Sequence, residues 1–238
     1  MQNLNYKFYA QSNPVVQDAY DILVANLHSG ISGVRPRTIC ITGAAAGVGK
    51  TTVAVNLAIS LTLANWRVLF VDADLRKDIS HKRLAEQNLL GLSDFLASNL
   101  PFESILTATN FEHLFYITCG DVTSINPIGL LCSQRFDDLL MTVRDCYDYV
   151  VIDTPSINAV ADPSVIAAKC DVTYVVTEMG KTTAATLRSS LDILKRSDVS
   201  VSGVILNRSD KTEYKTFYGA YNYFKAKSKY KAKKAPKK

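Results

Sequence analysis

A stretch of small residues near position 45 carries the residue types that bind a polyphosphate. It runs from Ile39 to Thr52 and reads ICITGAAAGVGKTT. Small residues let backbone N–H groups turn toward an anion, and a helix opening near Lys50 adds its positive N-terminal end. Lys50 is then expected to reach the β- and γ-phosphates of a nucleotide, and the Thr51 hydroxyl to bind Mg²⁺.

This stretch departs from the phosphate-loop pattern G-x-x-x-x-G-K-[ST] at its first glycine. That glycine falls at position 44, which is alanine, and Gly43 comes one residue early. A tight strand-to-helix turn without a ligand is the alternative interpretation, but the apolar strand before the loop and the helix after it favour phosphate binding. The predicted nucleotide-binding residues of the loop are Gly47, Val48, Gly49, Lys50, Thr51 and Thr52.

Aspartates follow two further apolar runs. Asp72 and Asp74 come after the run 67–71, and Asp153 comes after the run 149–152. Because ligands bind outside the carboxyl ends of the strands in an open parallel sheet, these acids and the phosphate loop should meet at one edge. The sequence therefore predicts a magnesium–nucleotide site there.

The order of apolar runs predicts an α/β fold of the P-loop NTPase type, with a mostly parallel sheet covered by helices on both faces. Residues 1–13 are expected to be loosely held, and the domain is expected to span 1–208. Expected helices lie at 14–27 (amphipathic), 50–64, 80–86, 92–98, 101–107, 133–145, 163–169 and 182–196. Expected strands lie at 38–42, 67–71, 113–118, 149–153, 172–177 and 201–206.

The net charge of +5 divides into a mildly acidic body and a basic tail. Residues 209–238 hold ten lysines against Asp210 and Glu213, which gives the tail +8 and leaves −3 for the rest. Aliphatic side chains vanish there, so the tail is expected to be disordered and flexible. Its tyrosines are Tyr214, Tyr218, Tyr221, Tyr223 and Tyr230.

The sequence shows neither a signal peptide nor an apolar run of the roughly 18 residues that cross a membrane. A cytoplasmic protein is expected. Its basic tail could recruit it to the anionic inner face of the membrane. Nucleic-acid binding by the same tail is an alternative, because aromatic rings stack on bases and lysines neutralise phosphates, but it is less favoured.

Three segments and the tyrosine cluster together resemble the bacterial tyrosine kinases. The segments read RVLFVDADLRK from Arg67, GLSDFL from Gly91 and YVVIDTP from Tyr149. Members of this family are autokinases that govern capsule and exopolysaccharide synthesis, and they share a P-loop ATPase fold with the cell-division and partition ATPases. The resemblance covers roughly residues 15–230.

The resemblance implies ATP and Mg²⁺ as cofactors and a role for each matching residue. Asp72 and Asp74 would supply the base for the tyrosine hydroxyl and a group near the metal, and Asn207 resembles an adenine contact. The implied catalytic residues are Lys50, Asp72, Asp74 and Asp153, and the implied Mg²⁺ ligands are Thr51, Asp74 and Asp153. The tail tyrosines would be the substrates, in trans within a homo-oligomer. A membrane-embedded activator of the polysaccharide co-polymerase type is the implied partner.

Several positions differ from the family pattern and keep two other functions open. Ala46, Val48 and Asp78 stand where the family has Pro, Glu and Pro, while Asp21 and Val24 replace two arginines used in subunit contacts. A partition- or positioning-type ATPase is one alternative, although its extra loop lysine would fall at position 45, which is alanine. A catalytically weak, nucleotide-binding adaptor is the other.

Overall fold

The computed structural model describes residues 2–6, 8, 13–30, 34–76, 89–121 and 126–209. The chain divides into two units, Met1–Asn207 and Arg208–Lys238, and the fold below is that of the first. The tail and its five tyrosines lie outside the described residues apart from Arg208 and Ser209, as do Asp78 and the helix predicted over 80–86.

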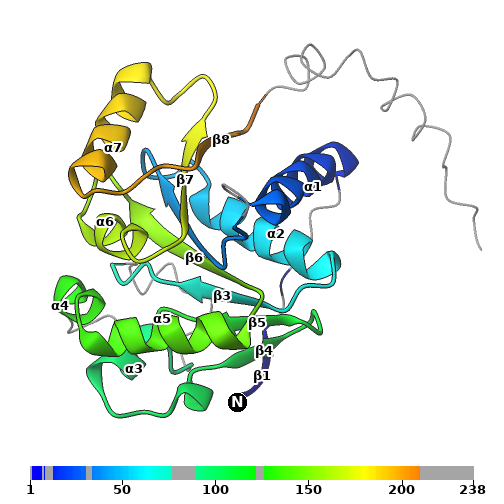
Figure 1. The fold of residues 1–238 in the computed structure, drawn as a ribbon, viewed down its shortest axis with the longest axis vertical. Coiled ribbons are helices and arrows are strands. Elements are labelled where there is room, and N and C mark those ends of the chain that lie inside the picture. Colours follow the sequence, from blue (N-terminus) through cyan, green and yellow to red (C-terminus); the bar gives the residue numbers. More distant parts are fainter. Residues whose placement is uncertain are drawn as a thin grey trace, which may run out of the picture. The chain divides into compact units, whose positions relative to one another are not determined.

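An eight-stranded sheet forms the centre of the first unit (Figure 1), in the order β1-β4-β5-β3-β6-β2-β7-β8. The strands are β1 (Gln2–Tyr6), β2 (Thr38–Gly43), β3 (Val68–Asp72), β4 (Thr107–Thr109), β5 (Leu114–Ile117), β6 (Tyr149–Ser156), β7 (Val172–Glu178) and β8 (Gly203–Asn207). The paired strands are parallel except β4 and β5, which are antiparallel. This confirms the predicted mostly parallel α/β fold.

Both faces of the central strands are buried, because successive strand residues point into two different cores. In β3, Val68 and Phe70 pack in the core that holds α1 and α2, while Leu69 and Val71 pack in the core under the other helices. The helices are α1 (Pro14–Ser29), α2 (Lys50–Leu63), α3 (Leu92–Ala97), α4 (Pro127–Leu131), α5 (Gln134–Cys146), α6 (Asp162–Ala167) and α7 (Ala184–Arg196). Within the described residues, no helix is both long and apolar enough to cross a membrane.

The N-terminal segment differs from the prediction that residues 1–13 are loosely held. Strand β1 pairs with β4, and the ring of Phe8 is 5% exposed. This ring meets Phe70 and Tyr116 edge-on, with centroids 5.8 and 5.4 Å away. An edge strand is held by backbone hydrogen bonds, which a segment without a long apolar run can also form.

The prediction of a helix over 101–107 is also wrong. The segment forms one 3₁₀ turn, Phe102–Ser104, and then β4, in which the side chain of Thr107 is fully buried. β-branched threonines suit this short strand better than a helix. Helix α4, which begins at Pro127, was not predicted.

Phe8→Ala is expected to lower the free energy of unfolding by about 3 kcal/mol, because it leaves a cavity where a buried ring packs. The matched variant Met141→Ala removes a side chain that is 65% exposed on α5 and should cost about 0.5 kcal/mol or less. Urea denaturation measures both. Equal losses in the two variants would contradict a core role for the N-terminal segment.

Candidate active site

The phosphate loop joins β2 to α2 through two glycines in left-handed backbone conformations. Gly47 has φ 75° and Gly49 has φ 90°, and Lys50 follows as the first residue of α2. A Cβ on Gly49 would lie 2.3 Å from the side-chain nitrogen of Asn207. Glycine is therefore required at position 49 both by the backbone and by the space available.

Side chains from two other segments fix the loop by binding its carbonyl groups. The Asn158 side chain donates to the carbonyl of Ala44 at 2.7 Å, and the Asn207 side chain donates to the carbonyl of Val48 at 2.8 Å. The backbone N–H of Ala44 donates to the Val176 carbonyl of β7 at 2.9 Å. Ala44 is not among the residues with positive φ, so its backbone does not require the glycine of the usual pattern.

Val48, where the family has Glu, is a core residue in this chain. It is 3% exposed and belongs to the core that α2 covers. A Cβ on Gly43 would lie 2.8 Å from Cγ2 of Val48, so the early glycine leaves room for the valine. The departure at position 48 thus goes together with the glycine at position 43.

The acids predicted to share one sheet edge lie together there. Asp72 and Asp153 are paired across β3 and β6, and they are 2% and 0% exposed. The backbone N–H of Asp74 donates to Oδ1 of Asp72 at 3.1 Å. Lys50 Nζ lies 3.6 Å from Asp74 Oδ2, with both side chains largely shielded from water. One cation and three carboxylates therefore surround the end of the phosphate loop.

The surroundings of the Asp153 carboxyl group favour the binding of a cation. Burial raises its pKa to about 7, Asp72 adds to the rise, and Lys50 opposes it. Neither carboxylate oxygen completes a hydrogen bond with the described residues, although the Thr51 hydroxyl is close enough to lower the pKa somewhat. Buried polar atoms are normally satisfied, so two unpaired oxygens fit a bound metal or its water ligands.

The described residues contain no group of three acidic, histidine or cysteine side chains that alone could hold a metal.

Three residues at this edge were missed by sequence reasoning. Asn158 binds the loop as described above, and Arg76 binds Asp162 through two hydrogen bonds. Arg76 stands inside the segment DADLRK that carried the family resemblance, which was the available signal. Asp162 and Asn158 give no signal in the sequence, because their partners are distant along the chain.

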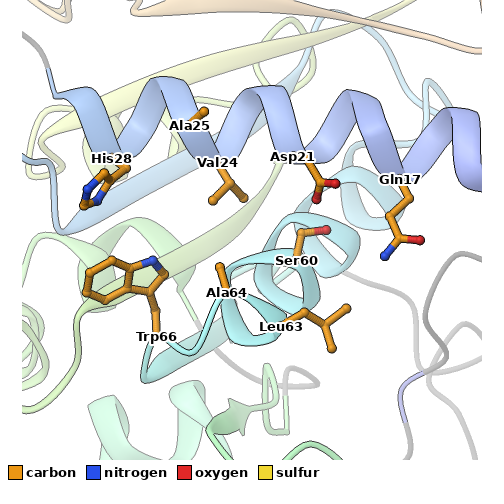
Figure 2. A pocket seen from close by; sticks show the side chains of 9 residues that line it. All are labelled: Gln17, Asp21, Val24, Ala25, His28, Ser60, Leu63, Ala64 and Trp66. Carbon is orange, nitrogen blue, oxygen red and sulfur yellow. The ribbon is translucent and has the colours of Figure 1, made fainter. Parts of the chain in front are cut away.

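A groove of about 500 Å³ between α1 and α2 is separate from this site (Figure 2). Its lining includes Leu63, which lies about 20 Å along α2 from Lys50 at the usual helical rise. Asp21 and Val24, the positions where the family has arginines, both line it. The full lining is Gln17, Asp21, Val24, Ala25, His28, Ser60, Leu63, Ala64 and Trp66.

Comparison with known proteins identifies the family. The AAA domain family matches residues 36–196. The tyrosine-protein kinase CpsD of Streptococcus pneumoniae serotype 4 is 34% identical over 195 residues, which are 82% of this chain and 85% of that protein. The tyrosine-protein kinase wzc of Salmonella typhi is 34% identical over 208 residues, which are 87% of this chain but 29% of that protein.

A solved structure agrees with these sequence matches. The kinase domain of the Escherichia coli tyrosine kinase ETK superposes with a TM-score of 0.75 at 33% identity, covering 82% of this chain and 77% of that one. The expected P-loop fold is thereby confirmed. Identity above 30% over most of both chains decides the family, and the chain belongs to the bacterial tyrosine-protein kinases.

Proposed function

We propose that this kinase uses ATP and Mg²⁺ to phosphorylate the tyrosines of its own C-terminal tail, and that it thereby regulates capsular or exopolysaccharide synthesis and export. One observation carries the proposal. A lysine at the start of α2 lies 3.6 Å from Asp74, beside the buried pair Asp72 and Asp153. Phosphoryl transfer depends mainly on positioning and charge neutralisation, and these groups supply both.

The phosphate loop would hold the triphosphate and its metal. Lys50 and the loop N–H groups would bind phosphate oxygens, while Thr51, Asp74 and Asp153 would face Mg²⁺. The unpaired oxygens of Asp153 support this assignment. When bound, Mg²⁺ would neutralise charge on the transferred phosphate. The proposed nucleotide contacts are Gly47, Val48, Gly49, Lys50, Thr51, Thr52 and, toward adenine, Asn207.

Asp72 or Asp74 would accept the proton of the tyrosine hydroxyl. An ordinary tyrosine has a pKa of about 10 and is protonated at neutral pH, so transfer benefits from a base. Asp74 is only partly buried and lies next to Lys50, whereas Asp72 is 2% exposed and accepts from the backbone of the same loop. Of the two carboxylates, Asp74 is therefore the more accessible and Asp72 the more shielded.

The tail of a neighbouring copy is the proposed substrate, through Tyr214, Tyr218, Tyr221, Tyr223 and Tyr230. The tail carries +8, and each phosphotyrosine adds about −1.5 to −2, so full modification would bring its charge to about zero or below. A cationic tail would rest on the anionic inner face of the membrane and leave it when phosphorylated. A membrane-embedded activator of the co-polymerase type is the proposed partner.

The two other functions are less well supported. A partition-type ATPase would carry a lysine in the loop at position 45, where this chain has alanine, and the relatives named above are called tyrosine kinases. The adaptor alternative rests on the altered loop and on Asp21 and Val24, which replace two arginines of the family pattern. The buried side chain of Val48 and the ordinary backbone conformation of Ala44 speak against a distorted loop.

Lys50→Met is expected to reduce phosphotyrosine formation with Mg-ATP by at least about 100-fold, because it removes a cation that stabilises the transferred phosphate. The matched variant Lys195→Met removes an exposed lysine of α7 and should keep wild-type activity. Phosphotyrosine mapping by mass spectrometry, with the activator segment present, measures both. ATP hydrolysis without phosphotyrosine in the wild type would instead support the partition-type ATPase.

Asp153→Asn is expected to flatten the pH dependence of stability in magnesium-free buffer. The pKa of Asp153 is raised from 3.8 to about 7, so the folded state retains a proton that the unfolded chain releases between these values. Stability should therefore fall as pH rises from 5 to 8, by about 2 kcal/mol more in the wild type than in the variant.

Denaturant titrations at several pH values in EDTA test this difference. Asp192→Asn, at an exposed position of α7, is the control and should follow the wild-type curve. Parallel curves for the wild type and Asp153→Asn would refute the raised pKa.

A further inference from the structure

Two residues outside the proposed set of catalytic groups join the two segments that carry the acids. Arg76 lies two residues after Asp74, and Asp162 is the first residue of α6, nine residues after Asp153. Arg76 Nε donates to Asp162 Oδ2 at 2.7 Å and Nη2 donates to Oδ1 at 3.0 Å. This bidentate contact fixes both the orientation of the guanidinium plane and its distance from the carboxylate. A lysine side chain cannot make such a contact.

Asp162 is fully buried, whereas the Arg76 side chain is 41% exposed. A buried carboxylate needs a charged or hydrogen-bonding partner, so Asp162 holds Arg76 firmly against α6. The chain just after the acids is therefore anchored to the segment that follows β6.

The anchor is linked to Asp74 through the backbone. The N–H of Arg76 lies 3.4 Å from Oδ1 of Asp74, and the N–H of Asp74 donates to Oδ1 of Asp72. With Oδ1 turned toward the loop backbone, Oδ2 of Asp74 faces Lys50 at 3.6 Å. A shift of the backbone at position 76 would turn the Asp74 carboxylate away from the lysine.

We propose that Arg76 and Asp162 are positioning residues, and that their ion pair orients Asp74 for phosphoryl transfer to tyrosine. The inference rests on the proposed function of this edge. Neither residue touches the nucleotide or the tyrosine in this role. Their loss should therefore lower kcat while leaving the KM for ATP nearly unchanged.

Two variants distinguish a loss of activity caused by a misplaced Asp74 from one caused by a less stable protein. Arg76→Lys keeps the positive charge but loses the bidentate contact. Its kcat should fall at least tenfold, while its KM for ATP should change less than about twofold. In the double variant Arg76→Leu/Asp162→Leu, an apolar pair replaces the ion pair, so the melting temperature should stay near or above that of the wild type. Its kcat should nevertheless remain at least tenfold low.

The control removes a different ion pair, Lys169–Asp137, which joins the segment just after α6 to α5. Lys169→Leu/Asp137→Leu should keep the wild-type kcat. Each protein is assayed as the full chain for tail phosphotyrosine and, separately, for ATP hydrolysis. A wild type that hydrolyses ATP without forming phosphotyrosine would refute the proposed substrate, and ATP turnover would then serve to compare the variants.

The positioning role is supported if activity stays low in a variant whose melting temperature is that of the wild type. It is overturned if either folded variant keeps its kcat within twofold of the wild type, or if the loss lies in the KM for ATP. Failure of both variants to fold would show that the pair is structural and would equally overturn it.

Discussion

Three carboxylates crowded at one poorly hydrated edge of the sheet are the constraint on which the rest of the structure depends. Asp72 and Asp153 lie side by side on neighbouring strands and are almost fully buried. Like charges at close range destabilise each other, and burial adds to the cost. The arrangement persists because Lys50 lies at the same edge and because a protonated Asp153 reduces the repulsion, as the raised pKa of its carboxyl indicates.

The strand register fixes this crowding. Asp72 pairs with Asp153, and a slip of one residue between β3 and β6 would move one of them to the other face of the sheet. Such a slip is opposed by the two cores, because it would also move Phe70 and Val71 to the wrong sides. The packing of the apolar residues therefore maintains the electrostatic repulsion between the two carboxyl groups, which a bound cation would reduce.

Much of the fold and of the site could be predicted from the sequence, because local patterns carry that information. Continuous apolar runs predicted the central strands, and Gly-Lys-Thr together with the aspartates after strands predicted the residues that meet at the edge. The ion pair of Arg76 and Asp162 could not be predicted, since 86 positions separate its members. Strand β1 was missed because an edge strand depends on backbone pairing with a distant segment, not on its own apolar residues.

The two α1 positions that depart from the family pattern lie away from the candidate active site. Asp21 and Val24 line the groove beside the C-terminal part of α2, whereas Lys50 begins that helix about 20 Å away. Between the groove and Lys50, Leu57 and Leu61 of α2 are fully buried in the core. Asp21 and Val24 therefore lie apart from the edge where Lys50, Asp72, Asp74 and Asp153 gather.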